Sequence, residues 1–334
     1  MKLKTSLSIF SASLLAAASV FGQASTMPVG FQTVTLKASS FNVVGINFLK
    51  APLVVGVLDS LTATTITDAG VDFSTALAGQ SNLVVEVTTG TGSGLWANVS
   101  SFSTNQLTVD TDLTASVSTG ASYQVFSLPT IAEVFGATNS AGLKDGNSTT
   151  ADIIWLSKGD GSGGFDKYYY AAAAPPFVTA GWKNTSTGNT NASGAAIYHH
   201  EAMIIERRGT TDLPVTFTGT VKTSPTTIPL FTGFNWIDRA YPSLATLSNS
   251  GLSTYLLAGN STTADIVWMA NATGGYDKYY FAVAAPPFVT AGWKKVGSGN
   301  TDAGSTSLES GIIIERRGGN TNLKITPDAA YGSL

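Results

Sequence analysis

The chain has 334 residues, of which only 12% are charged, with a net charge of −3 and no cysteine. Because charged residues are about half as frequent as usual, the polar surface must come from Thr, Ser, Asn and Gly, and no basic footprint for nucleic acid is expected. The lack of cysteine excludes disulfides, thiol catalysis and zinc–thiolate sites.

The first 24 residues have the pattern of a secretory signal peptide. Lys2 and Lys4 precede an apolar, Ala-rich run at 7–20, and small residues offer cleavage after Gly22 or Ala24. Serines interrupt this run, whereas a membrane helix needs about 20 unbroken apolar residues. No later stretch predicts a transmembrane helix either. We therefore predict export to the extracellular space or the bacterial cell surface, with the periplasm as an alternative.

A long internal repeat follows. Its two copies imply that one folding unit was duplicated within the chain, and the offset between them changes only in Gly/Ser/Asn-rich stretches, where loops tolerate length changes. The matching segments are GNSTTADIIWL (146–156) with GNSTTADIVWM (259–269), GGFDKYYYA (163–171) with GGYDKYYFA (274–282), AAPPFVTAGWK (173–183) with the identical 284–294, and IIERRG (204–209) with 313–318.

The first copy is interrupted. GINFLK (45–50) aligns with GFNWID (233–238), yet Pro129 follows Gly45 by 84 positions while Pro242 follows Gly233 by only 9. The first copy therefore holds an insertion of 75 residues between Pro52 and Ser127. Short β-branched runs separated by Gly, Asn, Asp and Ser predict a small β-barrel or sandwich there.

The repeats also read as strands rich in Tyr, Trp, Ile and Val, with one short helix expected in each copy, at PTIAEVF (129–135) and PSLATL (242–247), where Pro stands near the first turn. The predicted fold class is all-β: two homologous β-sandwich-like repeats, the first carrying the inserted module. The expected units are a signal peptide at 1–24, a first repeat at 25–52 plus 128–221, the inserted module at 53–127 and a second repeat at 222–334.

The identical AAPPFVTAGWK stretch predicts a structural corner. Two prolines stop sheet pairing, Phe is expected to pack against the fold, and a Gly-Trp turn begins the next strand. On this interpretation the letters recur because the fold needs the corner twice.

PVGFQTVTL, GINFLKAPL, TATTITDAGVDF and the DKYYY–GW–IIERR series together resemble a paralogous family of uncharacterised secreted proteins expanded in Verrucomicrobia. The resemblance covers nearly the whole mature chain. It implies export and β structure, and it brings no known activity.

No catalytic constellation emerges, so the chain is predicted not to be an enzyme. The only histidines, His199 and His200, stand beside Glu201, but the second copy has none, which favours an exposed loop feature over a metal site. Glu206 and Glu315 recur, and because two arginines follow each, an ion-paired strand is expected. Paired carboxylates for glycoside hydrolysis need only proximity and stay open at this point.

A calcium hypothesis rests on the Gly-rich loops before each DKYY strand, with no other cofactor expected. Oxygen-bearing side chains alternate there, and calcium takes six to eight oxygen ligands. The alternative is a Gly-rich hairpin with Asx turns. The candidate ligands are Asp160, Ser162 and Asp166 in the first copy and Asn271, Thr273 and Asp277 in the second.

The duplicated aromatic residues suggest a sugar-binding platform, because flat rings cover the C–H face of a pyranose. The candidate platform residues are Trp182, Trp293, Tyr169 and Tyr280. Consecutive aromatics on a strand point to opposite faces, so core packing competes with this interpretation.

The sequence as a whole favours an exported, non-catalytic structural, adhesive or surface-layer protein that self-assembles. The alternative is a carbohydrate-binding module for a surface glycan. An outer-membrane barrel is disfavoured because the strands are mostly shorter than about ten residues.

Overall fold

The computed structural model describes residues 27–158, 164–188, 190–241 and 245–327. Among them are 21 β-strands, two α-helices of four and five residues, and one 3-10 turn. The prediction of an all-β fold is confirmed. In this part of the chain, no helix is long and apolar enough to cross a membrane.

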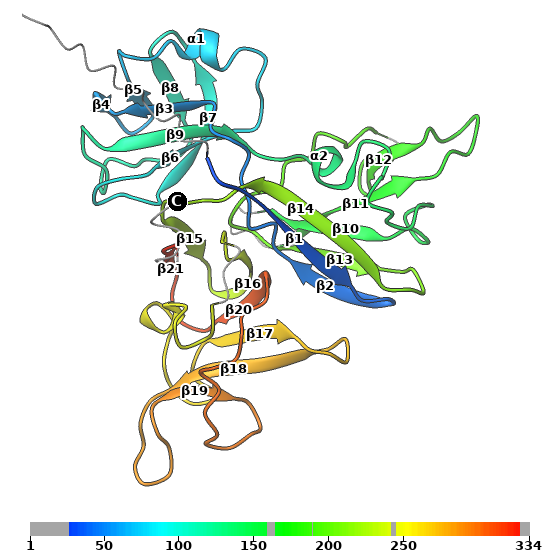
Figure 1. Cartoon of the computed structure of the whole chain (residues 1–334), viewed down its shortest axis with the longest axis vertical. Coiled ribbons are helices and arrows are strands. Elements are labelled where there is room, and N and C mark those ends of the chain that lie inside the picture. The colour runs from blue at the N-terminus through cyan, green and yellow to red at the C-terminus, as the bar shows by residue number, and fades with distance from the viewer. Residues whose placement is uncertain (1–26, 159–163, 189, 242–244, 328–334) are drawn as a thin grey trace, which may run out of the picture.

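Two five-stranded antiparallel sheets have the same order of strands (Figure 1). The first has the order β12-β11-β10-β13-β2 and the second β19-β18-β17-β20-β16. Their bounds are β2 Ser40–Val44, β10 Ile153–Ser157, β11 Phe165–Ala171, β12 Gly181–Asn184 and β13 Met203–Arg207 in the first sheet, and β16 Gly233–Asp238, β17 Ile266–Ala270, β18 Tyr276–Ala282, β19 Gly292–Lys295 and β20 Gly311–Arg316 in the second.

A two-stranded ribbon belongs to each of these sheets. β1 (Val29–Leu36) pairs with β14 (Leu213–Thr220), and β15 (Thr226–Leu230) pairs with β21 (Thr321–Ile325). Alternate side chains of each ribbon point inward, so that Leu36, Val215 and Phe217 share one core with the first five-stranded sheet. Leu230 and Leu323 do the same in the second unit.

Residues between β2 and α2 (Ile131–Phe135) form a seven-stranded sheet in the order β3-β9-β6-β7-β8-β5-β4. Its first and last strands, β3 and β4, are consecutive parts of one bent segment. At the bend, Leu58 N donates to Ala121 O on one side and Asp59 N donates to Thr67 O on the other. The sheet therefore closes into a barrel around its own core. The strands are β3 Val54–Val57, β4 Ser60–Leu61, β5 Thr65–Thr67, β6 Leu83–Val87, β7 Trp96–Phe102, β8 Gln106–Val109 and β9 Ser122–Ser127, with α1 at Phe73–Ala76.

The entry and exit of this barrel lie side by side, since Val54 pairs with Val125. α2 is fixed by a capping box in which Thr130 Oγ1 accepts from Glu133 N, and the Glu133 carboxylate accepts from Thr130 N. Adjacent ends let a closed module sit within a surface connection of the host unit.

The register corrects one alignment made from the sequence. Phe41 lies opposite Glu206 as Phe234 lies opposite Glu315, so FNVVG matches FNWID, and the alignment of Gly45 with Gly233 is wrong. The side-chain amides of Asn42 and Asn235 occupy equivalent positions, which confirms this register. Each donates to one main-chain carbonyl on the neighbouring strand and to two carbonyls of residues that precede it by two to five positions.

The two repeats contact each other through the outward faces of their five-stranded sheets. Val43 and Ala202 pack with Ile313, and Phe165 meets Trp236 at 4.5 Å between ring centroids. A Cβ at Gly311 would lie within 2.9 Å of main-chain atoms of Val44 and Gly45, so only glycine permits this approach of β2 to β20.

Candidate functional site

The repeated D-I-x-W and E-R-R-G letters form the same clamp in both copies. Asp152, fully buried, pairs with Arg207 and accepts main-chain hydrogen bonds from Arg208 and Gly209. The clamp in the second repeat has the same contacts from Asp265 to Arg316, Arg317 and Gly318. These groups are partnered within the fold, so the clamp is structural.

The recurring glutamates complete this clamp. Glu206 accepts from the Trp155 indole and from Arg208, and Glu315 accepts from the Trp268 indole and from Arg317. The expected ion-paired strand is therefore confirmed.

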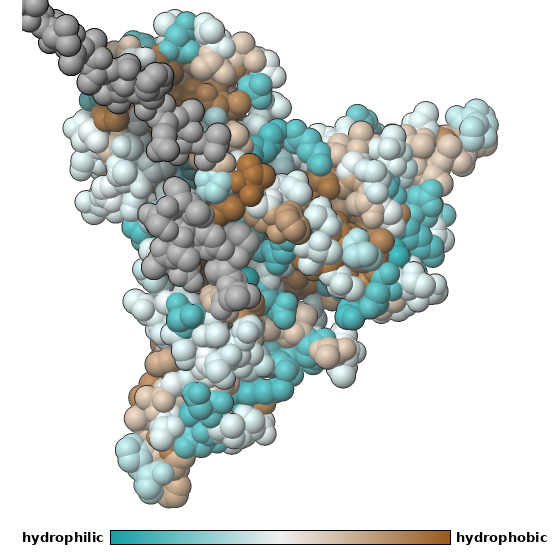
Figure 2. All heavy atoms as spheres, viewed as in Figure 1, coloured by the Kyte–Doolittle hydropathy of each residue, from teal (hydrophilic) through white to brown (hydrophobic). Residues whose placement is uncertain are grey.

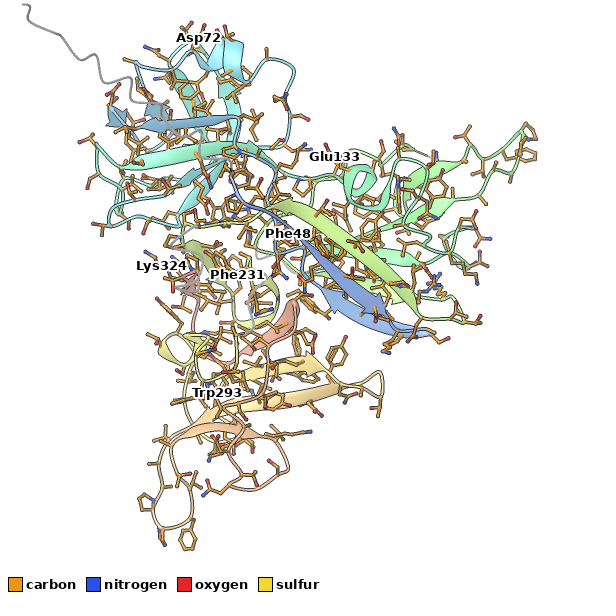
Figure 3. All side chains as sticks on the ribbon, viewed as in Figure 1. Phe48, Asp72, Glu133, Phe231, Trp293 and Lys324 are labelled. Atoms are coloured by element: carbon orange, nitrogen blue, oxygen red, sulfur yellow. The ribbon has the colours of Figure 1, made fainter. Side chains whose placement is uncertain are left out.

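The predicted sugar platform is wrong in its tryptophans. Trp182 and Trp293 are 1% and 2% exposed, and each packs in the core of its repeat. Figure 3 shows Trp293 against the sheet of the second repeat. Trp182 pairs across the strands with Tyr170, so Tyr169 points to the opposite face, and Tyr280 does the same relative to Trp293. These residues cannot form one platform.

The expected packing of Phe in AAPPFVTAGWK is also wrong. Phe177 and Phe288 are 83% and 81% exposed, the largest values among the exposed large apolar side chains. All residues of Ala173–Phe177 and Ala284–Phe288 are exposed, and we call these two segments the apolar tips. The tips lie in the connections β11–β12 and β18–β19, which project at two separate extremities of the molecule (Figure 1).

The rest of each eleven-residue stretch supports its tip. Ala174 and Val178 bond to each other across the turn, as do Ala285 and Val289. Below the turn, the buried Lys294 donates to Thr290 Oγ1 and Asn300 O. Lys183 likewise donates to Thr179 Oγ1. The fold thus uses the Thr, Trp and Lys of the motif, while its Phe faces outward.

The described calcium candidates are engaged in local contacts. Asn271 Oδ1 accepts from Thr273 N, Thr273 Oγ1 and Gly275 N, which is the Asx turn of a Gly-rich hairpin. Asp277 pairs with Lys295 at 2.7 Å, and this contact and a hydrogen bond from Asn271 lower the pKa of Asp277.

In the first copy, Asp166 lies on β11, beside a hollow described below, while Asp160 and Ser162 lie outside the described residues. No cluster of three or more His, Cys, Asp or Glu residues suited to a metal occurs in the part of the chain that the structure describes. Calcium stays a prediction.

The histidine pair is not an exposed loop feature, so that prediction is wrong. His199 and His200 are 4% and 3% exposed. Trp96 of the barrel lies 4.5 Å from the His200 ring, and Phe126 lies 5.3 Å from the His199 ring. The inserted barrel covers both histidines, and the second repeat has no barrel and no histidines.

A buried charge cluster lies under the histidines. Glu86 of the barrel forms an ion pair at 2.9 Å with Lys222, which belongs to the connection between the repeats, and also accepts from Gln124. Lys222 donates to the main-chain oxygens of Ser224 and Pro225. The cluster thus joins the barrel to the connection between the repeats in a place that is inaccessible to water, and His199 of the first repeat lies 3.9 Å from Glu86.

Burial governs the ionisation of these groups. It lowers the pKa of His200 to about 3 and that of His199 well below its usual range, where the positive charge of Lys222 adds to the effect. Burial also raises the pKa of Glu86 and lowers that of Lys222, although the two attract each other. The histidines are therefore neutral at pH 7.

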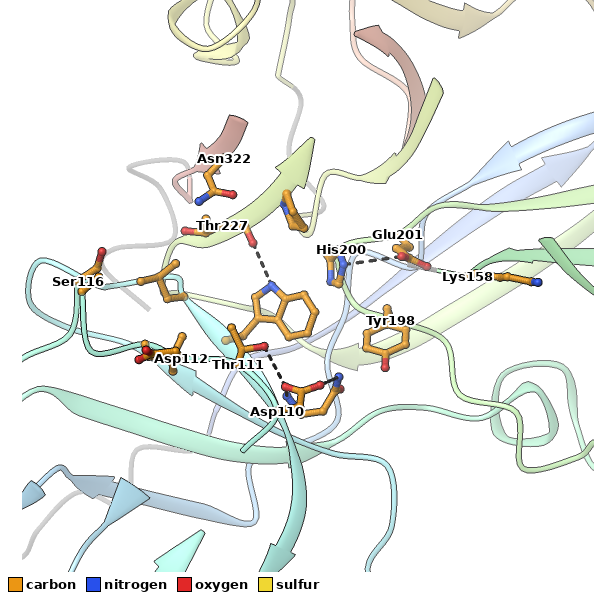
Figure 4. A pocket seen from close by; sticks show the side chains of 16 residues that line it. Asp110, Thr111, Asp112, Ser116, Lys158, Tyr198, His200, Glu201, Thr227 and Asn322 are labelled. Atoms are coloured by element: carbon orange, nitrogen blue, oxygen red, sulfur yellow. Dashed lines mark hydrogen bonds and ion pairs between the residues drawn. The ribbon is translucent and has the colours of Figure 1, made fainter. Parts of the chain in front are cut away.

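Above the histidines, the three units enclose a pocket of about 470 Å³ (Figure 4). We call it the junction pocket. Its lining includes Trp96, Asn98, Asp110 and Asp112 of the barrel, Lys158, Tyr198, His200 and Glu201 of the first repeat, and Thr227, Pro229 and Asn322 of the second. Two smaller hollows share Glu201 with it, one of which also contains Asp166.

The sequence could not reveal this pocket. Trp96 and Asp110 belong to the barrel and Thr227 to the second repeat, and no spacing motif connects them. The only available signal was the His199–His200 pair, which was assigned to a loop because the second copy lacks it.

Comparisons with protein-family models, with curated proteins and with solved structures find no match to this chain.

Proposed function

We propose that the protein is an exported, non-catalytic structural and adhesive component of the cell exterior, whose copies join through their apolar tips. The observation that carries this proposal is the exposure of both tips, at 83% and 81% for Phe177 and Phe288. Each tip consists of five apolar residues that are identical in the two repeats.

The tips are not explained by the needs of the fold. A phenylalanine that packs into a core is retained for stability, whereas these two face solvent at the ends of supported loops. Contiguous exposed apolar groups mark interaction sites in folded proteins. Two identical tips on one chain make the molecule bivalent.

We therefore expect a tip of one copy to pack against a tip of another. Identical surfaces can form a two-fold, self-complementary contact, and two such contacts per molecule generate an open chain. One contact is small compared with the roughly 1,200–2,000 Å² buried in stable interfaces, so each is weak. Repetition along a crowded surface supplies the avidity.

The low charge of the chain supports such a role. Much of the visible face is pale in Figure 2, that is, neither strongly hydrophilic nor strongly hydrophobic. The full chain has a net charge of −3, and removal of the predicted signal peptide with Lys2 and Lys4 leaves −5. Copies therefore repel one another only weakly, so that weak apolar contacts suffice to bring them together.

Light scattering of the mature chain over a concentration series tests the proposal. The wild type should grow into species larger than dimers, whereas Phe177→Ser or Phe288→Ser, each leaving one tip, should stop at dimers. The double variant should remain a monomer.

The matched control is Val55→Ser, which removes a 67% exposed apolar side chain from the barrel. It should assemble like the wild type. A wild type that stays monomeric at every concentration, or a double variant that still assembles, would overturn the proposal.

A further inference from the structure

We propose that the junction pocket binds an uncharged saccharide. This inference goes beyond self-association, because it concerns a different surface and does not depend on the tips. The site also differs from the Trp182 and Trp293 platform suggested by the sequence, since those rings are buried.

The pocket has the size and rigidity of a ligand site. Its volume of about 470 Å³ lies within the range of roughly 300–1,000 Å³ usual for small-molecule pockets. Trp96 is held in place because its indole Nε1 donates to Thr227 O at 3.0 Å, a contact between the barrel and the second repeat. Tyr198 lies 5.9 Å from the Trp96 ring. The two rings offer apolar surface for the C–H groups of a sugar.

The polar groups suit hydroxyls. Asp110 is oriented by Asn98, whose main-chain N and side-chain Nδ2 donate to its two carboxylate oxygens at 3.0 and 2.8 Å. Asp112 Oδ1 accepts from Thr114 N and Oγ1, and no hydrogen bond to Oδ2 occurs among the described residues. Carboxylate oxygens accept from hydroxyls, while Asn322 and Lys158 supply donors around the same space.

His200 adds a third ring to the lining, independently of the carboxylates. Its ring lies 4.5 Å from the Trp96 ring and 5.6 Å from the Tyr198 ring. The three rings together extend the apolar surface that the pocket offers to the C–H groups of a sugar.

Charge selects among ligand classes. Asp110, Asp112 and Glu201 outnumber Lys158 among the lining residues, so anions are disfavoured. The carboxylates do not gather into a cluster suited to a metal ion in the described part of the chain, so a compact cation is not the expected ligand either. An uncharged, polyhydroxylated ligand with apolar faces fits both parts of the lining.

The experiment is isothermal titration of the mature wild-type chain with neutral oligosaccharides, namely cellotriose, xylotriose, maltotriose and chitotriose, with spermidine and glucuronic acid as charged probes. At least one neutral oligosaccharide should bind, and Asp112→Asn and Tyr198→Ala, which removes the ring, should each weaken it about tenfold or more. Binding of only a charged probe, or of none of the compounds, would overturn the inference.

Asp72→Asn is the matched control. Asp72 accepts from Ser74 and Thr75 much as Asp112 accepts from Thr114, but it lies at the end of the barrel away from the pocket (Figure 3). It should bind as the wild type does, and equal weakening by Asp72→Asn and Asp112→Asn would also contradict the site. The Phe177→Ser/Phe288→Ser variant should keep full saccharide binding, which separates this test from that of self-association.

Discussion

At the residue scale, the buried carboxylate of each clamp is the group on which its repeat depends most. Asp152 neutralises Arg207 and receives main-chain hydrogen bonds in a place that water does not reach. Removing one member of such a pair leaves a buried charge without a partner, which costs more than the intact pair contributes.

We predict that Asp152→Ala lowers the free energy of unfolding by about 3–5 kcal/mol. Lys37→Met removes an ion pair to Asp212 whose side chains are 50% and 46% exposed, and it should change stability by less than about 1 kcal/mol. Urea denaturation of both variants measures the difference. Similar losses in the two variants would contradict the assignment of Asp152 as the centre of the clamp.

The histidines give stability a defined pH dependence. Since the pKa of His200 in the folded protein is about 3 and its usual value is 6.5, the unfolded chain binds the proton first as the pH falls. Stability contributed by the neutral ring is therefore present above pH 6.5 and lost between pH 6.5 and 3. His199 acts with the same sign, because its pKa is also lowered.

Acidic groups at the junction act in the opposite direction. Burial raises the pKa of Asp238 from 3.8 to about 6, so stability contributed by its protonated form is lost as the pH rises through about 6. Glu86, whose pKa burial also raises, acts with the same sign. Lys222, whose pKa burial lowers, and Glu201, 3.9 Å from His200, face the same histidines. A comparison of the wild type with a variant that lacks both histidines separates their contribution to stability from that of these groups.

Between pH 6 and 5, we expect wild-type stability to fall relative to His199→Gln/His200→Gln by up to about 1.4 kcal/mol per histidine. Urea denaturation at the two pH values, with both proteins measured in parallel, checks this result. A constant difference in stability between the two proteins would show that the histidines do not titrate on unfolding.

At the element scale, the sequence predicted where strands form better than it predicted how they align and which side chains are buried. Alternation and β-branched runs identified the strands of both repeats and the barrel, because these patterns are local. The offset of Phe41 from Phe234 was missed because GINFLK shares two residues with GFNWID, as many as the corresponding FNVVG shares with FNWID, so letters alone do not choose between the two alignments.

Exposure of the tips was not predictable from their letters. Pro-Pro-Phe indicates a turn with an apolar residue, and nothing local tells whether that residue packs inward. Phe135, which is buried, follows TIAEV, and Phe177, which is exposed, follows AAAAPP, so that apolar residues precede both. Burial of the histidines was missed for a related reason, because Trp96 and Phe126, which cover them, belong to an insertion far away in sequence.

At the scale of the whole molecule, the connection between the repeats is tied to the barrel. Lys222 and Glu86 form the only ion pair between the barrel and this connection in the described part of the chain, and both are almost fully buried. The barrel thereby fixes the place from which the second repeat departs, and the junction pocket depends on that arrangement.

We predict that Lys222→Met and Glu86→Gln each destabilise the protein by about 3–5 kcal/mol and that the double variant loses clearly less than the sum. A double-mutant cycle from urea denaturation measures the coupling. Strictly additive losses would mean that the pair does not hold the barrel to the connection.

The central claim is that copies of the protein meet tip to tip, and a chain without cysteine permits a direct test. Cysteine introduced as Ala173→Cys and Ala284→Cys keeps both phenylalanines, and a disulfide forms only when the two Cβ atoms approach to about 4 Å. After mild oxidation, the mature double variant should give a ladder of covalent multimers on a non-reducing gel. Ala78→Cys, exposed on the barrel, should stay largely monomeric. Equal cross-linking at the tips and at residue 78, or none at the tips, would contradict the account.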